Sequence, residues 1–198
     1  MKIIGITGPT GAGKSVLSSL LSELGYPTID ADKVYHDMLI PPSECLDAIR
    51  SHFGDGVFAQ DGTLERAKLS QIVFNSPEKL ELLNKTVLGK VIKRITKMTV
   101  EYSRRGVQTV IVDAPTLIES GFNKKCSLVI SVLAPTELRV KRIMERDSIN
   151  EEAARLRVRA QKDDSFYLNS SDRVLYNTEN YESFKKEVLS LFSELGIS

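Results

Sequence analysis

The sequence predicts an α/β protein built on a parallel sheet, and three observations lead to that prediction. Short runs rich in isoleucine and valine recur along the chain, helical stretches separate them, and a glycine-rich motif follows the first run. The strongest runs are Lys2–Thr7, Thr109–Val112 and Leu128–Leu133, with a weaker one at Arg173–Tyr176. The apolar residues of the first three are nearly continuous, which is typical of strands covered on both faces.

Amphipathic helices are predicted beside these strands. Ser15–Leu24 carries its leucines at helical spacing and is followed by Gly25, and Tyr181–Leu195 closes the chain in the same way. Strands that alternate with helices favour a doubly wound sheet with right-handed crossovers.

Two further helical stretches interrupt this pattern and define the expected parts of the domain. Residues 41–100 are helical in pattern without a strong strand, and we predict that this insertion recognises the substrate. Residues 136–165 form a polar helical pair with little apolar content, which predicts a mobile lid. The nucleotide-binding core then comprises about 1–40, 101–135 and 166–198.

Length and charge fit one domain and exclude some partners. The 198 residues are 41% hydrophobic, which is enough for a full core. Lys and Arg total 27 and Asp and Glu total 26, so the net charge of +1 gives no overall attraction to nucleic acid or an acidic membrane. We therefore predict that the protein binds neither nucleic acid nor a membrane. We also predict that it is a monomer or a weak homo-oligomer.

Cysteine usage and the first residues predict a cytoplasmic location. Cys45 and Cys126 are isolated, so we expect free thiols and no structural zinc site. The apolar start is broken at Gly8-Pro9, which is too early for a signal peptide. No run reaches the roughly 18 apolar residues that span a bilayer.

The strongest chemical signal is the segment Gly-Pro-Thr-Gly-Ala-Gly-Lys-Ser at residues 8–15. An apolar strand precedes it and an amphipathic helix follows, as a phosphate-binding loop requires. Glycines let backbone N–H groups turn toward an anion, and the helix points its positive end at the same place. Lys14 is expected to reach the β- and γ-phosphates of ATP, and the Ser15 hydroxyl to hold Mg²⁺. The expected nucleotide contacts in this segment are Gly8, Thr10, Gly11, Ala12, Gly13, Lys14, Ser15 and Val16.

A pair of carboxylates, Asp30 and Asp32, follows a short extended run about 15 residues after the loop. Residues just past the end of a parallel strand face the ligand crevice. One of the pair could accept a proton from a substrate hydroxyl or help to organise Mg²⁺. Alternatively, the pair only caps the next helix. His36 lies four residues past Asp32 and is a candidate substrate contact.

Asp113 is a third candidate carboxylate, because it ends an apolar strand. In phosphate-loop proteins a carboxylate at this place often lies near the metal. The alternative is a solvated loop acid.

Three arginines share one face of the first helix of the predicted lid. Arg139, Arg142 and Arg146 are spaced i, i+3 and i+7. They either close over the nucleotide phosphates or form a solvated face paired with neighbouring acids. The pattern Ser148-x-x-Glu151 predicts a capping box at the start of the next helix.

Taken in order and spacing, several segments resemble the dephospho-CoA kinase family over nearly the whole chain. These segments are Gly8–Ser15, Asp30–Asp32, Ser51–Gly54, Asp61–Arg66, Asp113–Pro115 with Leu117 and Glu119, Gln161, and Asp172–Val174 with Asn177.

This resemblance implies a P-loop NTPase-type core, a helical CoA-binding insertion and a lid. It implies ATP-dependent phosphorylation of the ribose 3′-hydroxyl of dephospho-CoA, the last step of CoA biosynthesis. The two catalytic residues that it implies are Asp32, as the general base, and Lys14. Arg142 falls near the ATP adenine or phosphates, and Asn177 falls where the family touches the adenine. The remaining residues implied to contact the acceptor are Arg66, Leu117 and Glu119; for Arg66 a salt bridge with Glu65 or Glu81 is the alternative.

The sequence also departs from the family pattern. Leu88-Gly89 stands where members carry His-Pro, and the segment after Gln161 carries acids and an aromatic residue where members carry two arginines. The alternatives are therefore a nucleoside or nucleotide kinase of similar core, or a catalytically weak ATP-binding relative. A GTPase would carry the base-reading motif Asn-Lys-x-Asp, and none occurs.

Overall fold

The computed structural model describes residues 1–178 and 180–196, and it divides into two compact units. The core unit comprises Met1–Ile29 and Tyr102–Ser198, and the helical unit comprises Asp30–Glu101. The range 166–198 expected for the core includes residues 179, 197 and 198, which lie outside the described residues.

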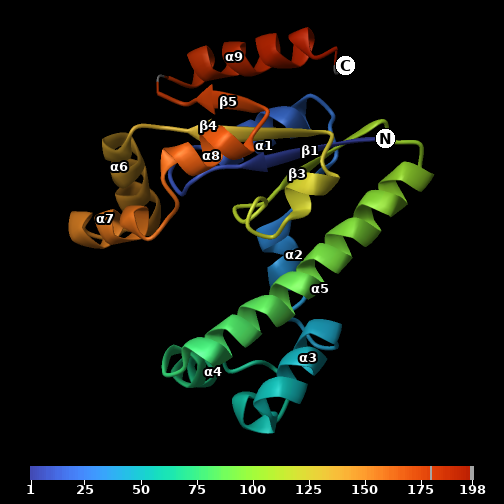
Figure 1. Cartoon of the computed structure of the whole chain (residues 1–198), viewed down its shortest axis with the longest axis vertical. Coiled ribbons are helices and arrows are strands. Elements are labelled where there is room, and N and C mark those ends of the chain that lie inside the picture. Colours follow the sequence, from blue (N-terminus) through green and yellow to red (C-terminus); the bar gives the residue numbers. More distant parts are fainter. Residues whose placement is uncertain (179, 197–198) are drawn as a thin grey trace. The chain divides into compact units, whose positions relative to one another are not determined.

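A five-stranded sheet forms the centre of the core unit, in the order β2-β3-β1-β4-β5 (Figure 1). The strands β1 and β3, β1 and β4, and β4 and β5 pair in parallel. The predicted α/β class is confirmed. The strand bounds are β1 Lys2–Thr7, β2 Thr28–Asp30, β3 Thr109–Asp113, β4 Leu128–Leu133 and β5 Arg173–Tyr176.

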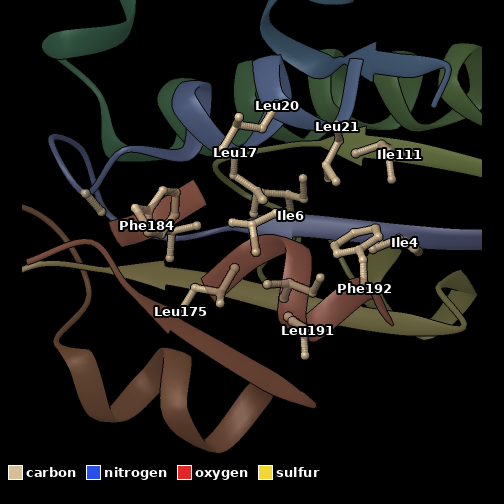
Figure 2. Packing of buried hydrophobic residues seen from close by; sticks show 14 of the residues in the cluster. Ile4, Ile6, Leu17, Leu20, Leu21, Ile111, Leu175, Phe184, Leu191 and Phe192 are labelled. Atoms are coloured by element: carbon tan, nitrogen blue, oxygen red, sulfur yellow. The ribbon is translucent and has the colours of Figure 1, made fainter. Parts of the chain in front are cut away.

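Helices α1 (Lys14–Glu23) and α9 (Tyr181–Glu194) pack on the same side of this sheet. Figure 2 shows leucines of α1 and the phenylalanines of α9 meeting the isoleucines of β1. Both faces of the central strands are buried, which explains why their apolar residues run without alternation.

The rest of the core unit contributes η2 (Phe122–Lys125), α6 (Thr136–Asp147), α7 (Glu151–Arg159) and α8 (Asp164–Ser170). Helices α6 and α7 lie next to each other (Figure 1). They pack through a small cluster that includes Val140, Ile143 and Ala154.

The predicted capping box at Ser148 is wrong. Ser148 ends α6 in the left-handed conformation with φ of 52°, and Asn150 caps α7 by accepting a hydrogen bond from the backbone N–H of Ala153. A residue that closes one helix with positive φ does not have the extended backbone of an N-cap.

The helical unit comprises α2 (Ala31–Asp37), α3 (Glu44–Phe53), η1 (Asp55–Val57), α4 (Arg66–Phe74) and most of the long α5 (Pro77–Arg104). Its own apolar cluster includes Leu46, Ile49, Val57 and Leu69. Among the described residues, no helix is long and apolar enough to cross a bilayer.

Candidate active site

The loop of residues 8–13 joins β1 to α1 and has glycine at three positions with positive φ, of which Gly8 and Gly13 are the most crowded. Gly8 and Gly13 have φ of 136° and 103°, which side chains rarely adopt. A Cβ on Gly8 would lie 2.2 Å from the carbonyl oxygen of Val132, and one on Gly13 would lie 2.0 Å from Nδ2 of Asn177. The turn of the loop and its close packing both require the motif glycines.

The loop leads directly into the N-terminus of α1, which has no side-chain cap. The first N–H groups of a helix have no partner within it, so the N-terminus of α1 offers donors to an anion. The Lys14 Nζ donates to the carbonyl oxygen of Gly8 at 2.8 Å, which holds the lysine across the loop. Ser15 is exposed beside it, whereas Ala12 is fully buried in the core cluster and Val16 packs against that cluster.

The side chains of Arg142 and Asn177 stabilise the loop through hydrogen bonds to its backbone. The Arg142 Nη1 donates to the carbonyl oxygens of Gly11 and Ala12 at 3.2 and 3.3 Å, and its Nη2 donates to Asn177 Oδ1 at 3.1 Å. Asn177 Nδ2 donates to Ala12 O at 3.1 Å. Both side chains therefore donate hydrogen bonds to carbonyl oxygens of the loop backbone.

Thr10 is held by residues of the predicted lid range. Its backbone N–H donates to Gln161 Oε1 at 2.6 Å, and its carbonyl oxygen accepts from Arg139 Nε at 3.0 Å. Arg146, by contrast, pairs mainly with Asp147. The three arginines therefore differ: two contact the loop backbone, and one is a surface ion pair.

Arg139 is a buried cation, with only 4% of the residue exposed. Its Nη2 has no hydrogen-bond partner among the described residues, and Asp164 lies 3.9 Å from its Nη1. Burial lowers the pKa of Arg139 from its usual value, and Asp164 opposes that shift. Burial also lowers the pKa of Arg142. The two guanidinium groups place positive charge next to the loop.

Asp113 lies at the end of β3, beside the end of β1, because Ile6 pairs with Asp113 in the sheet. The Asp113 Oδ2 accepts a short hydrogen bond from Ser18 Oγ, which also lies 3.1 Å from the carbonyl oxygen of Lys14. Asp113 is thus tied to the first turns of α1. Ser18 was not predicted, although its position four residues after Lys14 places it on the same face of α1.

Leu117 and Glu119, the two residues of this segment expected to contact the acceptor, differ in burial. Leu117 is fully buried, and its Cδ2 would lie 2.5 Å from a Cβ on Gly5, so it fills the core behind β1. It offers no surface to a substrate, and its predicted role is corrected accordingly. Glu119 is exposed, and its charge helps to raise the pKa of Tyr167, although burial is the larger cause.

In the helical unit, Asp30 and Asp32 have different roles. Asp30 Oδ1 accepts from the backbone N–H groups of Asp32 and Lys33 at 2.8 and 3.0 Å, so Asp30 is the N-cap of α2. Asp32 lies in the first turn with an exposed side chain. His36 Nδ1 lies 2.7 Å from the carbonyl oxygen of Asp32. Asp30 therefore caps the helix, whereas no capping bond of the Asp32 side chain is found in the described part of α2.

Arg66 is the first residue of α4 and is exposed. Glu65 pairs with Lys68, and no ion pair to Arg66 is found in the described part of the chain. Neither salt bridge that was the alternative for Arg66, with Glu65 or with Glu81, is therefore found among the described residues.

Comparisons with known proteins agree with this geometry. The model of the family described as dephospho-CoA kinase matches residues 2–183. The dephospho-CoA kinase of Carboxydothermus hydrogenoformans is 33% identical over 194 residues, covering 98% of this chain and 94% of that protein. That of Corynebacterium jeikeium is 37% identical over 188 residues, covering 95% and 96%.

Solved structures show the same fold. A dephospho-CoA kinase from Campylobacter jejuni aligns with a TM-score of 0.73 and 29% identity, covering 98% of each chain. A shikimate kinase from Acinetobacter baumannii shares the fold alone, with a TM-score of 0.53 and 16% identity over all of this chain and 96% of that one.

The parallel sheet, the phosphate loop at the end of β1 and these neighbours define a P-loop kinase, a class of ATP-dependent phosphotransferase. Within that class, the chain belongs to the dephospho-CoA kinase family.

Proposed function

We propose that this chain transfers the γ-phosphoryl group of ATP to the ribose 3′-hydroxyl of dephospho-CoA, which gives CoA and completes CoA biosynthesis. Family membership supports the reaction. The observation that carries it is the loop itself: glycines at positions where a side chain would be strained and crowded, Lys14 held across them, and the N-terminus of α1 without a side-chain cap.

The core unit supplies the nucleotide half of this proposal. Loop N–H groups and Lys14 would surround the β- and γ-phosphates, where fixed donors stabilise the charge of the transition state. Arg142 and Asn177 are proposed as positioning residues, because they hold the loop carbonyls and thereby fix where the loop N–H groups point.

The helical unit supplies the acceptor half. Asp32 is proposed as the general base, since a carboxylate ionised at neutral pH can orient a hydroxyl and accept its proton. His36 lies four residues on, on the same side of α2, and would contact the same substrate. Arg66 would pair with a phosphate of the acceptor. The insertion at residues 41–100 is thus the proposed acceptor-binding part.

The residues present would hold Mg²⁺ only when the nucleotide supplies further ligands. Among the described residues, no group of three or more His, Cys, Asp or Glu side chains could hold a metal ion alone. Ser15 is exposed next to the loop and Asp113 ends β3 beside the end of β1, so these two would hold the ion beside the phosphates. When bound, Mg²⁺ neutralises charge on the β- and γ-phosphates.

The segment 136–165 is proposed as a lid. Its contacts with the loop come from Arg139, Arg142 and Gln161, whereas α7 is mostly exposed. A lid attached at the loop and free further out can respond to bound phosphates. We also propose a reducing cytoplasm as the location, supported by the free thiols Cys45 and Cys126.

An acceptor panel tests the function. With ATP and Mg²⁺, kcat/KM for dephospho-CoA should exceed that for adenosine, AMP and shikimate by at least about 10³-fold, because remote binding energy is used in the transition state. Phosphorus NMR of the product should show a 3′-monophosphate. Equal rates across the panel, or turnover of a nucleotide alone, would replace this proposal with the nucleoside or nucleotide kinase.

A further inference from the structure

Gln161 lies in the short link between α7 and α8, residues 160–163, and has no role yet in the proposed reaction (Figure 1). Its Oε1 accepts a hydrogen bond from the backbone N–H of Thr10 at 2.6 Å. The two residues are 151 positions apart in the sequence, and both belong to the core unit. The fold therefore brings one side chain of this link directly to the phosphate loop.

The conformation of the loop explains why the N–H of Thr10 needs an outside partner. The backbone N–H of Ala12 donates to the carbonyl oxygen of Pro9 at 3.2 Å, which closes a turn over residues 9–12. Thr10 is the second residue of this turn, and the N–H at that position takes no part in the closing hydrogen bond. Backbone N–H groups of such a loop are the donors that surround bound phosphates. Gln161 thus lies at one of the donors of the phosphate-binding loop.

The position of Lys14 indicates which phosphate would lie nearest to this contact. The Lys14 Nζ donates to the carbonyl oxygen of Gly8 at 2.8 Å, so the side chain bends back to the first residue of the loop. In P-loop proteins this lysine reaches the β- and γ-phosphates. Thr10 follows Gly8 by only two residues, so we expect the transferred phosphoryl group on the same side of the loop as the Gln161 amide.

The Gln161 amide can serve the loop and a ligand at the same time. A glutamine amide has one acceptor oxygen and an NH₂ group with two donors. Because the N–H of Thr10 requires an acceptor, Oε1 faces Thr10 and Nε2 faces elsewhere. No hydrogen bond of Nε2 is found in the described part of the chain, and the residue is exposed. Its two N–H donors can therefore be presented to a group that binds at the loop.

Helix ends on both sides fix the backbone of Gln161. Its own N–H donates to the carbonyl oxygen of Val158 at 3.3 Å, at the end of α7. On the other side, Asp163 caps α8, since its Oδ1 accepts from the N–H of Phe166 at 3.0 Å. Donors that are held in place before the reaction are the ones that stabilise a transition state most effectively.

The other charged side chains near Gln161 are directed to different partners. The link and α8 contain one cation, Lys162, whose Nζ lies 5.5 Å from the centre of the Phe166 ring. Asp164 lies 3.9 Å from Nη1 of the buried Arg139. Among the described residues of this link, Gln161 is the one whose side chain is bonded to the loop.

We propose that Gln161 is a further catalytic residue, whose Nε2 donates a hydrogen bond to an oxygen of the γ-phosphoryl group while Oε1 stays bonded to Thr10. The inference rests on the proposed phosphoryl transfer and adds no step to it. The bond from phosphorus to the β,γ-bridging oxygen breaks and the bond to the acceptor oxygen forms, and Gln161 moves no proton. Its donor stabilises the negative charge on the phosphoryl oxygens in the transition state.

Gln161→Glu separates the two functions of the amide. The carboxylate keeps an acceptor for the N–H of Thr10, but it replaces the NH₂ donor with a second, negatively charged oxygen. We expect kcat to fall by at least about tenfold and ATP affinity to weaken by about tenfold. ADP affinity should change by less than about twofold, because ADP lacks the γ-phosphate. Calorimetry with each nucleotide, without acceptor, and steady-state turnover measure these effects.

Gln161→Met removes the donor without adding a charge. Its kcat should also fall by at least about tenfold, whereas its ADP affinity should change by less than about threefold. The matched charge control is Gln108→Glu. Gln108 accepts from the N–H of Lys2 at the start of β1, whereas the loop follows the end of that strand. The strand separates the two by about 16 Å, which exceeds the Debye length of about 8 Å, so this control should change each value by less than about twofold.

Two results would overturn the role of Gln161. One is turnover of Gln161→Glu within about twofold of the native chain, which would leave only support of the loop. The other is an equal loss of ATP and ADP affinity in that variant, which would show that the γ-phosphate is not contacted. Failure of the proposed transfer is distinct, because the native chain itself would then not phosphorylate dephospho-CoA. The nucleotide affinities would still test the contact in that case.

Discussion

Lys14, directly after the phosphate loop, and Asp32 in helix α2 are the two side chains proposed for phosphoryl transfer, and the loop and the helix are held in place by different means. Arg142 and Asn177, which support the loop, lie 131 and 165 residues away from their partners Gly11 and Ala12. Helix α2 is capped by Asp30, two residues before Asp32. The nucleotide site therefore depends on distant tertiary contacts, whereas the start of α2 is fixed by its own neighbours in sequence.

The largest effect is expected inside the loop itself. Lys14→Ala should lower kcat by at least about 10²–10³-fold, since it removes a fixed charge from the transferring phosphoryl group. The fold should remain, which circular dichroism and the thermal midpoint can check. Turnover close to that of the native chain in a folded variant would contradict the assignment of the loop.

The distant support of the loop is tested by Gly13→Ala. The added Cβ meets Asn177, so ATP affinity should fall by about tenfold or more. The positive φ should also lower the stability of the fold by about 1–2 kcal/mol. Gly25→Ala is the matched control: Gly25 has φ of 89° but nothing within 4 Å of the added atom. It should cost stability by about 1 kcal/mol and leave ATP affinity unchanged. Equal losses of ATP affinity would mean that the contact with Asn177 is unimportant.

A smaller effect is expected at Arg66 in the helical unit. Arg66→Ala should raise the acceptor KM by about tenfold and change the ATP KM by less than about twofold, because one charge-assisted contact is lost. Lys68→Ala, which removes a neighbouring exposed cation paired with Glu65, is the control. If both KM values rise together, Arg66 is structural.

The smallest effect concerns the core behind β1. Burial, with a contribution from Asp172, raises the pKa of the Cys126 thiol to about 12. A raised pKa keeps the thiol protonated, so its alkylation in the folded protein should stay slow from pH 7 to 9, whereas a free cysteine reacts faster as it passes its pKa of about 8.5. Mass spectrometry of Cys126 follows the label. A fast rate that levels off above about pH 8.5, as for a free cysteine, would contradict the raised pKa of this thiol.

Local features of both regions could be predicted from the sequence. Runs of apolar residues and the positions of glycines predict the strands, the loop and helices α1 and α9. These patterns involve only residues that are close together in the sequence. The pair Asp30 and Asp32 was recognised, but sequence patterns left open which one caps the helix. Only the hydrogen bonds of Asp30 decide it.

Features that depend on distant contacts could not be predicted. Helical spacing placed Arg139 and Arg142 on one face of α6 but did not reveal that this face meets the loop carbonyls. Leu117 matched a family position, yet its side chain packs against Gly5 in the core. Spacing within one helix or motif does not specify which segment from elsewhere in the chain packs against it.

The central claim is that the core unit binds the nucleotide and that Asp32 in the helical unit activates the acceptor. Its most direct test is Asp32→Asn, which keeps the shape and removes the charge, with ATP affinity measured by calorimetry beside steady-state turnover. We expect ATP binding close to that of the native chain and a kcat lower by roughly 10²–10⁴-fold, the range for a positioned base. A fall in kcat of less than about tenfold, or a collapse of ATP binding, would contradict this division of roles.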